Sequence, residues 1–462
     1  MTSVAVPASN VAKNSRSFNA LVDRLLIVGA TYAYALSIFI SYKLYLFPLW
    51  GYFGFVYSEP QHRDFFFAFL MLTIASVSLP RTFLRPSSVI LFFMYAVVFV
   101  PTIVVTLCLS ADTLVTHWRI LLSLTFAFVM CSLTSRLQTT TRSHNIGYPS
   151  HRLINSFLIL WLFIAILNIA VYHSVMGFAG IETAYEQREA GASKNALTAY
   201  SQTLFSSVIN PTIFVLGLVY RKKNYVWVGI LGSLLIYSIS AQKTILLLPM
   251  VIYAFYKFLS VKSIRLKTPA APLALLAVLT FVASMTYEEN ELIWLFAALF
   301  VFRTIAVPGL TYSQYHEFFF ANGYTFWSHV KGFSSFVPTP SIYANDPLWP
   351  GLGYMIGEFA YGRSDLNANA NLFSGDGVAA AGWAGVLIIG LLFSIWLKAL
   401  DLVATKWSPK FVALGVMPLA ISFTNGHFFT NLLSFGGLAW LFILFFFRPQ
   451  YSQGITETSR AK

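Results

Sequence analysis

Residues 87–108 read SSVILFFMYAVVFVPTIVVTLC, an apolar run without a charged side chain that follows Arg81 and Arg85. A helix needs about 17 to 25 apolar residues to cross the hydrocarbon core of a bilayer, and this run is long enough. A segment in lipid must satisfy its backbone hydrogen bonds internally, so the run predicts a membrane-spanning helix.

Similar runs recur along the whole chain. Of the 462 residues, 57% are apolar and only 10% are charged, against about 25% charged in soluble domains. This composition excludes a soluble globular enzyme, and two cysteines are too few for a disulfide scaffold. We expect an all-α, polytopic membrane bundle of about 12 spans, read near 22–46, 64–80, 87–108, 117–135, 153–175, 201–220, 225–240, 243–260, 270–287, 377–400, 411–425 and 427–447.

The net charge of +13 is explained by where the basic residues lie. If the tail before Leu21 is cytoplasmic, 21 of the 30 Lys and Arg residues fall on the cytoplasmic side, as the positive-inside rule expects. We therefore expect both tails, 1–20 and 448–462, in the cytoplasm, with one membrane domain over 21–447. The charge reports topology, so we do not expect nucleic acid as a partner.

Two predicted outer loops, 176–200 and 308–376, exceed the short connectors elsewhere, and long loops on one face are where a membrane enzyme carries its chemistry. The apolar stretch 288–307 breaks the alternation, because a crossing there would place 308–376 inside. We interpret it as a re-entrant or interfacial helix. The alternative is a full crossing compensated by a second one between 315 and 345.

Several cations lie outside the cytoplasmic clusters. Arg303 stands in the apolar run FAALFVFRTIAV, where a guanidinium must face protein, water or an anion, unless it snorkels to the interface. For Lys243, in SAQKTILLLP, the same two interpretations apply: contact with an anion, or snorkelling to the interface. Arg188, in TAYEQREAG, either forms local ion pairs or offers a bidentate fork to phosphate. Lys331 and Arg363 complete the predicted substrate-binding cations.

The string YSQYHEFFFANGYTFWSHVKGF, residues 312–333, combines aromatic and titratable side chains. Aromatic faces pack on sugars, and a carboxylate or imidazole can accept a hydroxyl proton. An amphipathic belt at the interface is the alternative. We predict Glu317 as the general base, with His329, His316 and Asp365 as further candidates, and Tyr312, Tyr315 and Asn369 as substrate-binding residues.

The chain has no P-loop, zinc-ligand spacing, HExxH or GxSxG motif. We therefore expect no cofactor and no metal.

The segment from Arg303 to Val386 resembles the Wzy-type oligosaccharide repeat-unit polymerases of bacterial envelopes. The resemblance rests on an Arg in an apolar helix, followed by PGLTYSQYHEFFF, WPGLGYMIGEFAYG, NANANLF and GWAGVLIIG, with SAQKTILLLP upstream. The motifs cover about a fifth of the chain and the span organisation most of it. The family more often has an aromatic residue where this chain has His316. This difference favours Glu317 over His316 as the catalytic residue.

What the resemblance implies is a metal-independent glycosyltransferase at the outer face of the bacterial inner membrane. It would move a growing glycan from undecaprenyl diphosphate onto the next lipid-linked repeat unit, for O-antigen, capsule or exopolysaccharide. A chain-length-regulating co-polymerase is the implied protein partner, beside the lipid bilayer.

Three other functions stay open. An O-antigen ligase has a similar architecture. A metal-using lipid-phosphosugar glycosyltransferase would centre on Glu59 and Asp64, in SEPQHRD. A polysaccharide or lipid transporter would move substrate without forming a glycosidic bond.

Overall fold

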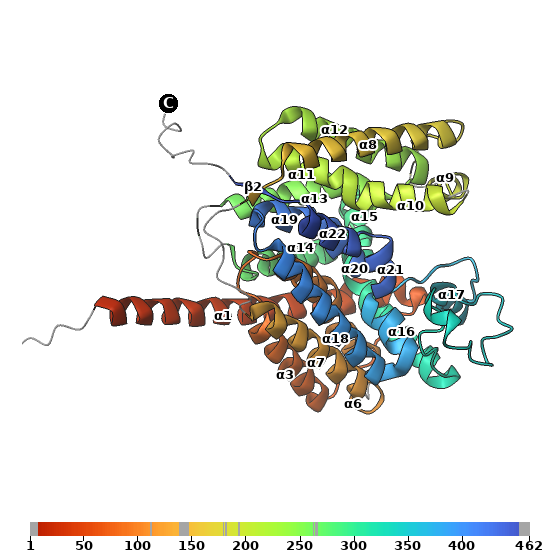
Figure 1. Ribbon diagram of the computed structural model, residues 1–462. Helices are drawn as coiled ribbons and strands as arrows, with labels where there is room; N and C mark the ends of the chain where they lie inside the picture. Colours follow the sequence, from red (N-terminus) through yellow and green to blue (C-terminus); the bar gives the residue numbers. More distant parts are fainter. Residues whose placement is uncertain are drawn as a thin grey trace, which may run out of the picture. The chain divides into compact units, whose positions relative to one another are not determined.

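The computed structural model describes residues 8–110, 113–137, 147–178, 180, 183–192, 195–261, 263 and 267–451. The described chain is helical almost throughout, as expected, and its strands are limited to β1 (Gly147–Tyr148) and β2 (Gln450–Tyr451), which pair antiparallel. Figure 1 traces the helices in chain order. They belong to two compact units, which are described separately.

Unit 1 comprises residues 1–83, 91–133 and 262–392 and contains the segment with most of the predicted site residues. Its elements are α1 (Ala8–Ser41), η1 (Tyr42–Leu46), α2 (Phe47–Trp50), η2 (Gly51–Phe53), α3 (His62–Ser78), η3 (Met94–Phe99), α5 (Val100–Leu109), α6 (Thr113–Thr116), α14 (Ala270–Thr286), α15 (Glu291–Ala297), η6 (Ala298–Ala306), α16 (Val307–Asn322), η7 (Phe333–Ser335), α17 (Leu352–Tyr361) and η8 (Phe373–Val378). It also holds parts of α4 (Pro86–Phe93), α7 (Trp118–Arg136) and α18 (Ala379–Ala404).

Unit 2 comprises residues 84–90, 134–261 and 393–462. Its elements are β1, α8 (His151–Tyr172), α9 (Ala184–Ala190), α10 (Ala196–Leu204), η4 (Phe205–Ile209), α11 (Asn210–Val219), α12 (Lys223–Ser240), α13 (Lys243–Ser260), α19 (Pro409–Gly415), α20 (Met417–Phe423), α21 (Phe428–Leu433), α22 (Gly437–Phe446) and β2.

Among the described residues, nine helical segments are long and apolar enough to cross a membrane. Eight coincide with predicted spans, and the ninth is Glu291–Asn322. Of the other four predicted spans, 64–80, 225–240 and 270–287 form the single helices α3, α12 and α14, of 17, 18 and 17 residues. The span 411–425 divides into α19 and α20, which have seven residues each. The structure therefore supports a multi-pass membrane protein and leaves the predicted number of 12 spans untested.

The predicted loop 308–376 begins too early. Residues 307–322 form α16, which continues α15 and η6 without a break into one helix of 32 residues. Pro308 stands in the first turn of α16, where a missing N–H is tolerated. The predicted loop also ends too late, at 376, since η8 starts at Phe373 and leads directly into α18. The connection between α16 and η8 is therefore 323–372, and it contains the short helices η7 and α17. Within the predicted loop 176–200, the described residues include α9 and the start of α10.

Both ends of the 32-residue helix lie on one side of unit 1. Near its start, Trp294 stacks on Trp50 at the end of α2, with ring centroids 6.4 Å apart. Near its end, His316 Nε2 bonds the Thr116 carbonyl just before α7 begins. These two places are on the same side, because the Ser58 amide, in the connection after η2, bonds the carbonyl of Cys108 at the end of α5. This arrangement favours the re-entrant or interfacial interpretation of the helix. We call this side of unit 1 the site face.

Gly309 lets α16 approach α5 closely. A Cβ at this position would lie 2.8 Å from the Pro101 carbonyl oxygen and 2.8 Å from Val105 Cβ. A side chain would therefore push the two helices apart. The close packing holds the following turns of α16, which carry Ser313, His316 and Glu317, against the start of α7.

Candidate functional site

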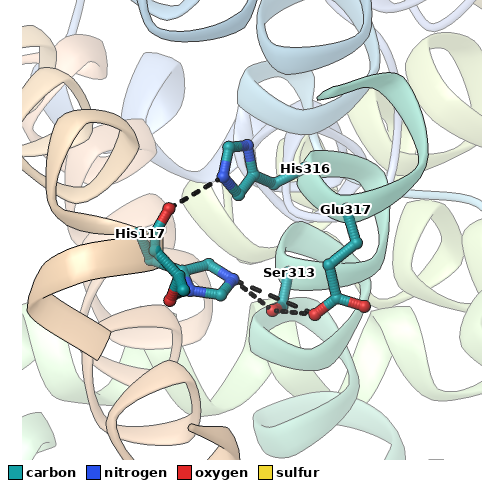
Figure 2. Close-up of polar contacts among 5 residues, drawn as sticks. His117, Ser313, His316 and Glu317 are labelled. Atoms are coloured by element: carbon teal, nitrogen blue, oxygen red, sulfur yellow. Dashed lines mark hydrogen bonds and ion pairs between the residues drawn. The ribbon is translucent and has the colours of Figure 1, made fainter. Parts of the chain in front are cut away.

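A group of hydrogen-bonded polar side chains lies where α16 meets the turn before α7. Ser313 and Glu317 are four residues apart on α16, so they share one face of the helix. His117 faces them from the turn, and Figure 2 shows its ring directed at Ser313 and Glu317, with His316 above. We call His117, Ser313, His316 and Glu317 the His-Ser-Glu cluster.

His117 is buried and bonded through both ring nitrogens. Its Nδ1 lies 2.6 Å from Thr116 Oγ1 and its Nε2 lies 2.9 Å from Ser313 Oγ. Burial, followed by the neighbouring His316, lowers the pKa of His117 to about 4. The imidazole is therefore neutral at physiological pH, with one donor nitrogen and one acceptor nitrogen.

One arrangement of protons satisfies the hydrogen bonds that link His117, Ser313 and Glu317. Ser313 donates its hydroxyl to Glu317 Oε1 at 3.2 Å. Ser313 Oγ then accepts from His117 Nε2–H, which leaves Nδ1 to accept from the Thr116 hydroxyl. The result is a continuous chain of hydrogen bonds from the buried imidazole to the carboxylate.

Glu317 is the open end of this chain. Its side chain is 54% exposed, whereas that of His117 is only 5% exposed. Its Oε1 also lies 3.9 Å from His117 Nε2. The carboxylate can therefore meet a hydroxyl from solvent or a ligand, while Ser313 and His117 behind it hold its orientation.

His316 is less suited to act as a base. Its Nε2 lies 3.1 Å from the Thr116 carbonyl oxygen, which can only accept, so this nitrogen carries the proton. The other nitrogen, Nδ1, is buried and receives no hydrogen bond from the described residues. The ring packs edge-on against His117, with centroids 5.1 Å apart. His316 therefore serves to fix the ring of His117.

His329 forms a separate buried pair with Asp376. Its Nε2 lies 3.3 Å from Asp376 Oδ1, and its Nδ1 lies 2.8 Å from Thr325 Oγ1. Both side chains are almost fully enclosed. The amides of Thr325 and Phe326 also bond carbonyls of α18, at Ala379 and Ala380. These contacts give His329 a role in fixing the turn after α16 to the start of α18.

Asp365 is held by Arg363. Two hydrogen bonds, of 3.2 and 2.6 Å, join the guanidinium to the carboxylate, and both side chains are exposed. The guanidinium, which donates to the carboxylate, lowers the pKa of Asp365. A more acidic carboxylate accepts a proton less readily, so Asp365 is a weaker base candidate than Glu317.

Arg303 is exposed and lies near Tyr361. Burial is the main reason why the pKa of Tyr361 rises to about 12, and the positive charge of Arg303 acts in the opposite direction. Tyr361 also exchanges hydrogen bonds of 2.9 and 3.1 Å with Gln314 of α16. Because Arg363 follows Tyr361 by two residues, two predicted cations belong to the same part of unit 1.

The remaining substrate-binding candidates divide into packed and exposed residues. Tyr312 and Tyr315 are fully buried, and their hydroxyls bond the backbone carbonyls of Ile120 and Ala368. They serve the packing of α16. Lys331 and Asn369 are exposed.

Arg188 and Lys243 belong to unit 2. Gln187 of α9 donates to the carbonyls of Val175 and Ser238, so α9 is fastened to the end of α12. The Arg188 guanidinium lies 3.5 Å from the Ala241 carbonyl oxygen, two residues before Lys243. The structure thus brings these two cations to the same turn of unit 2.

Sequence reasoning missed His117 and Ser313. Ser313 stands 196 residues from its partner His117, and a single His at the end of an apolar helix carries no recognisable motif. The spacing of Ser313 four residues before Glu317 was the signal that could have linked these two side chains.

Comparisons with models of protein families, with curated proteins and with solved structures find no match to this chain.

Proposed function

We propose that this protein is a membrane glycosyltransferase that polymerises lipid-diphosphate-linked oligosaccharide repeat units at the outer face of a bacterial inner membrane. The sequence resemblance suggests the reaction. The observation that carries the proposal is the hydrogen-bonded chain from His117 through Ser313 to the exposed Glu317 carboxylate. Such a network can orient an exposed carboxylate as a general base for a sugar hydroxyl.

In this proposal Glu317 accepts the proton of the acceptor hydroxyl as that oxygen attacks the anomeric carbon of the donor glycan. The bond from the anomeric carbon to the lipid diphosphate breaks, and the lipid diphosphate leaves. Ser313 donates to the carboxylate and fixes its orientation. Neutral His117 completes the network without placing a positive charge beside the base, which would lower its basicity.

Arg303 fits the diphosphate of the acceptor lipid. Arg303 and Glu317 stand fourteen residues apart on one helix, a separation of about 20 Å at a rise of about 1.5 Å per residue. A diphosphate bound at Arg303 is thus too far from Glu317 to be the leaving group of the donor sugar. In the acceptor, the hydroxyl that reacts belongs to the sugar farthest from the acceptor's own diphosphate. One repeat unit can therefore span the distance from Glu317 to Arg303.

The donor diphosphate needs another cation close to Glu317. Arg119 is exposed, follows His117 by two residues and packs over the ring of Trp118. We assign it to the leaving diphosphate, where a guanidinium stabilises the developing charge. This assignment uses separate donor and acceptor cations within unit 1. It replaces the single group of substrate-binding cations predicted from the sequence: Arg188, Lys243, Arg303, Lys331 and Arg363.

The glycolipid ladder of a strain that lacks this protein tests the proposal. Complementation with wild type should restore long glycans, and Glu317→Gln should leave single repeat units, because loss of a general base costs about 100-fold to 10,000-fold in rate. Glu358→Gln, which removes an exposed carboxylate of α17, is the matched control and should restore the ladder.

Other ladders would contradict the proposal. Complete absence of glycan from the acceptor core would indicate a ligase, and a normal ladder in the deletion strain would exclude both transferases. A normal ladder with Glu317→Gln at wild-type expression would remove Glu317 from the mechanism. The proposal also expects polymerisation by purified protein to persist in chelator. Its loss, with restoration by a divalent cation, would show that the reaction needs a metal.

A further inference from the structure

Asp64 is a buried acid that the proposed reaction does not use. It stands in the first turn of α3, where its Oδ2 accepts from the Gln61 amide at 3.3 Å and the Gln61 side chain caps the helix in return. The Asp64 side chain is 1% exposed. One carboxylate oxygen therefore has a structural role in starting the helix.

The second oxygen, Oδ1, has no such role. Among the described residues, none gives it a hydrogen bond. Arg63 Nε lies 4.0 Å from it, beyond hydrogen-bonding distance. A buried carboxylate oxygen without a donor is unfavourable, and a ligand that supplies a donor would remove this cost.

A small cavity adjoins this carboxylate. Its volume is about 20 Å³, enough for one group of the size of a water molecule. Apart from Asp64 the walls are almost wholly apolar, and they come from three helices: Phe67 and Met71 of α3, Ile103 and Leu107 of α5, and Trp118 and Leu121 of α7. The polar group among these lining residues is a carboxylate, which attracts a cation more strongly than a neutral water molecule.

We infer that this cavity binds the ammonium group of an aminophospholipid, with Asp64 as its acceptor. A primary ammonium is about the size of water, carries three donors and is attracted by an anionic oxygen in apolar surroundings. The Arg63 side chain is half exposed beside the cavity and suits the lipid phosphate. The adjacent residues Arg63 and Asp64 thus match the adjacent phosphate and ammonium of a phosphoethanolamine headgroup.

The surroundings favour a lipid over a soluble amine. On α3 the neighbouring Phe65, Phe66 and Phe69 are 40 to 63% exposed, as expected for side chains that face acyl chains. The cavity lies at the site face, at the ends of apolar helices, where headgroups of a bilayer would be found. The site is therefore a headgroup pocket at the edge of unit 1.

Native mass spectrometry of the purified full-length protein tests this site. The protein is incubated with phosphatidylethanolamine, phosphatidylcholine or phosphatidylglycerol of identical acyl chains. We expect about tenfold more phosphatidylethanolamine than phosphatidylcholine bound, because methylation removes every N–H donor. Asp64→Asn should abolish this preference, and Glu59→Gln, which changes an exposed acid in the loop before α3, should keep it.

Asp64→Asn also changes a residue that caps α3, so a second variant is needed that leaves this cap intact. Ala68→Leu fills the cavity and leaves Asp64 in place, so it should also abolish the preference. Equal binding of the two lipids by wild type, or a preference retained in both Asp64→Asn and Ala68→Leu, would overturn the inference. Displacement of the lipid by millimolar free phosphoethanolamine would assign the pocket to a soluble headgroup and overturn its assignment to lipid.

Discussion

Ser313 bonds both His117 and Glu317, so its hydroxyl decides how the two titratable groups communicate. We predict that Ser313→Ala lowers polymerisation about tenfold, less than Glu317→Gln, because the carboxylate stays but loses its orienting donor. Thr311→Ala is the control, since that buried hydroxyl bonds only carbonyls of its own helix. Rates from purified protein would be compared, and equal losses in both variants would point to a general effect of shortening α16 side chains.

The stability of the protein should depend on the protonation of His117. The folded protein holds its pKa at about 4, against an ordinary value of 6.5. The unfolded chain therefore binds a proton first as the pH falls. Stability that is present above pH 6.5 is lost between pH 6.5 and about 4, by ~3 kcal/mol.

Melting temperatures in detergent measure this effect. The fall between pH 6.5 and 4 should be shallower for His117→Gln, which does not titrate, than for wild type. His151→Gln, which replaces an exposed histidine, should follow the wild-type profile. Parallel profiles for wild type and His117→Gln would show that His117 is not the group responsible.

These residues mark the limit of sequence reasoning. Glu317 could be chosen from its local pattern, because an acid among aromatic side chains beside a predicted span is visible in one string. The roles of Tyr312 and Tyr315 were not visible there, since their hydroxyls bond Ile120 and Ala368, which are distant in sequence. Asp365 was a reasonable base candidate until the structure showed its two hydrogen bonds to Arg363.

At the scale of elements, α16 depends on its glycine. Gly309→Ala places a methyl group 2.8 Å from the Pro101 carbonyl oxygen, a backbone atom that cannot turn away. Overpacking of this kind costs about 1 to 3 kcal/mol, more than the gain of up to about 1 kcal/mol from replacing a helical glycine by alanine. We therefore predict a net loss of stability and of activity.

The chain offers a matched substitution. Gly29, in α1, has nothing within 4 Å of an added Cβ, so Gly29→Ala should leave the melting temperature unchanged or raise it. Thermal denaturation of both variants separates close packing from helix propensity. A higher melting temperature for Gly309→Ala would show that α5 and α16 yield easily at this contact.

Most helices could be predicted from the sequence, because a long apolar run can adopt few structures other than a membrane-spanning helix. The prediction of helix boundaries failed where an apolar helix continues into a polar segment. Residues 308–322 were assigned to a loop because YSQYHEF is polar, yet Tyr312, Ser313 and Tyr315 are buried against neighbouring helices. Burial of polar side chains depends on partners from α5 and α7, which no local pattern reveals.

At the scale of the whole molecule, the two ends of unit 1 hold different charged groups. Arg24 bonds the carbonyls of Val77 and Leu79 at the end of α3, and Arg81 and Asp23 lie nearby. The opposite end, the site face, holds the acids Glu59, Asp64, Glu291 and Glu317 beside the cations Arg63 and Arg119. Because the sequence predicts 21 of the 30 Lys and Arg residues on one side of the membrane, we predict that the end with Arg24 and Arg81 faces the cytoplasm. We therefore predict that the site face is outside, where lipid-linked repeat units would be polymerised.

Cysteine labelling tests this topology. Asn345 is exposed in the 323–372 connection on the site face, and both native cysteines are buried, so they should give little background. In cells with a permeabilised outer membrane, Asn345→Cys should react with a membrane-impermeant maleimide. Lys406→Cys, predicted to be cytoplasmic, should react only after lysis of the inner membrane. The reverse pattern would put Glu317 on the cytoplasmic side, away from the proposed substrates, and would exclude the polymerase together with the topology.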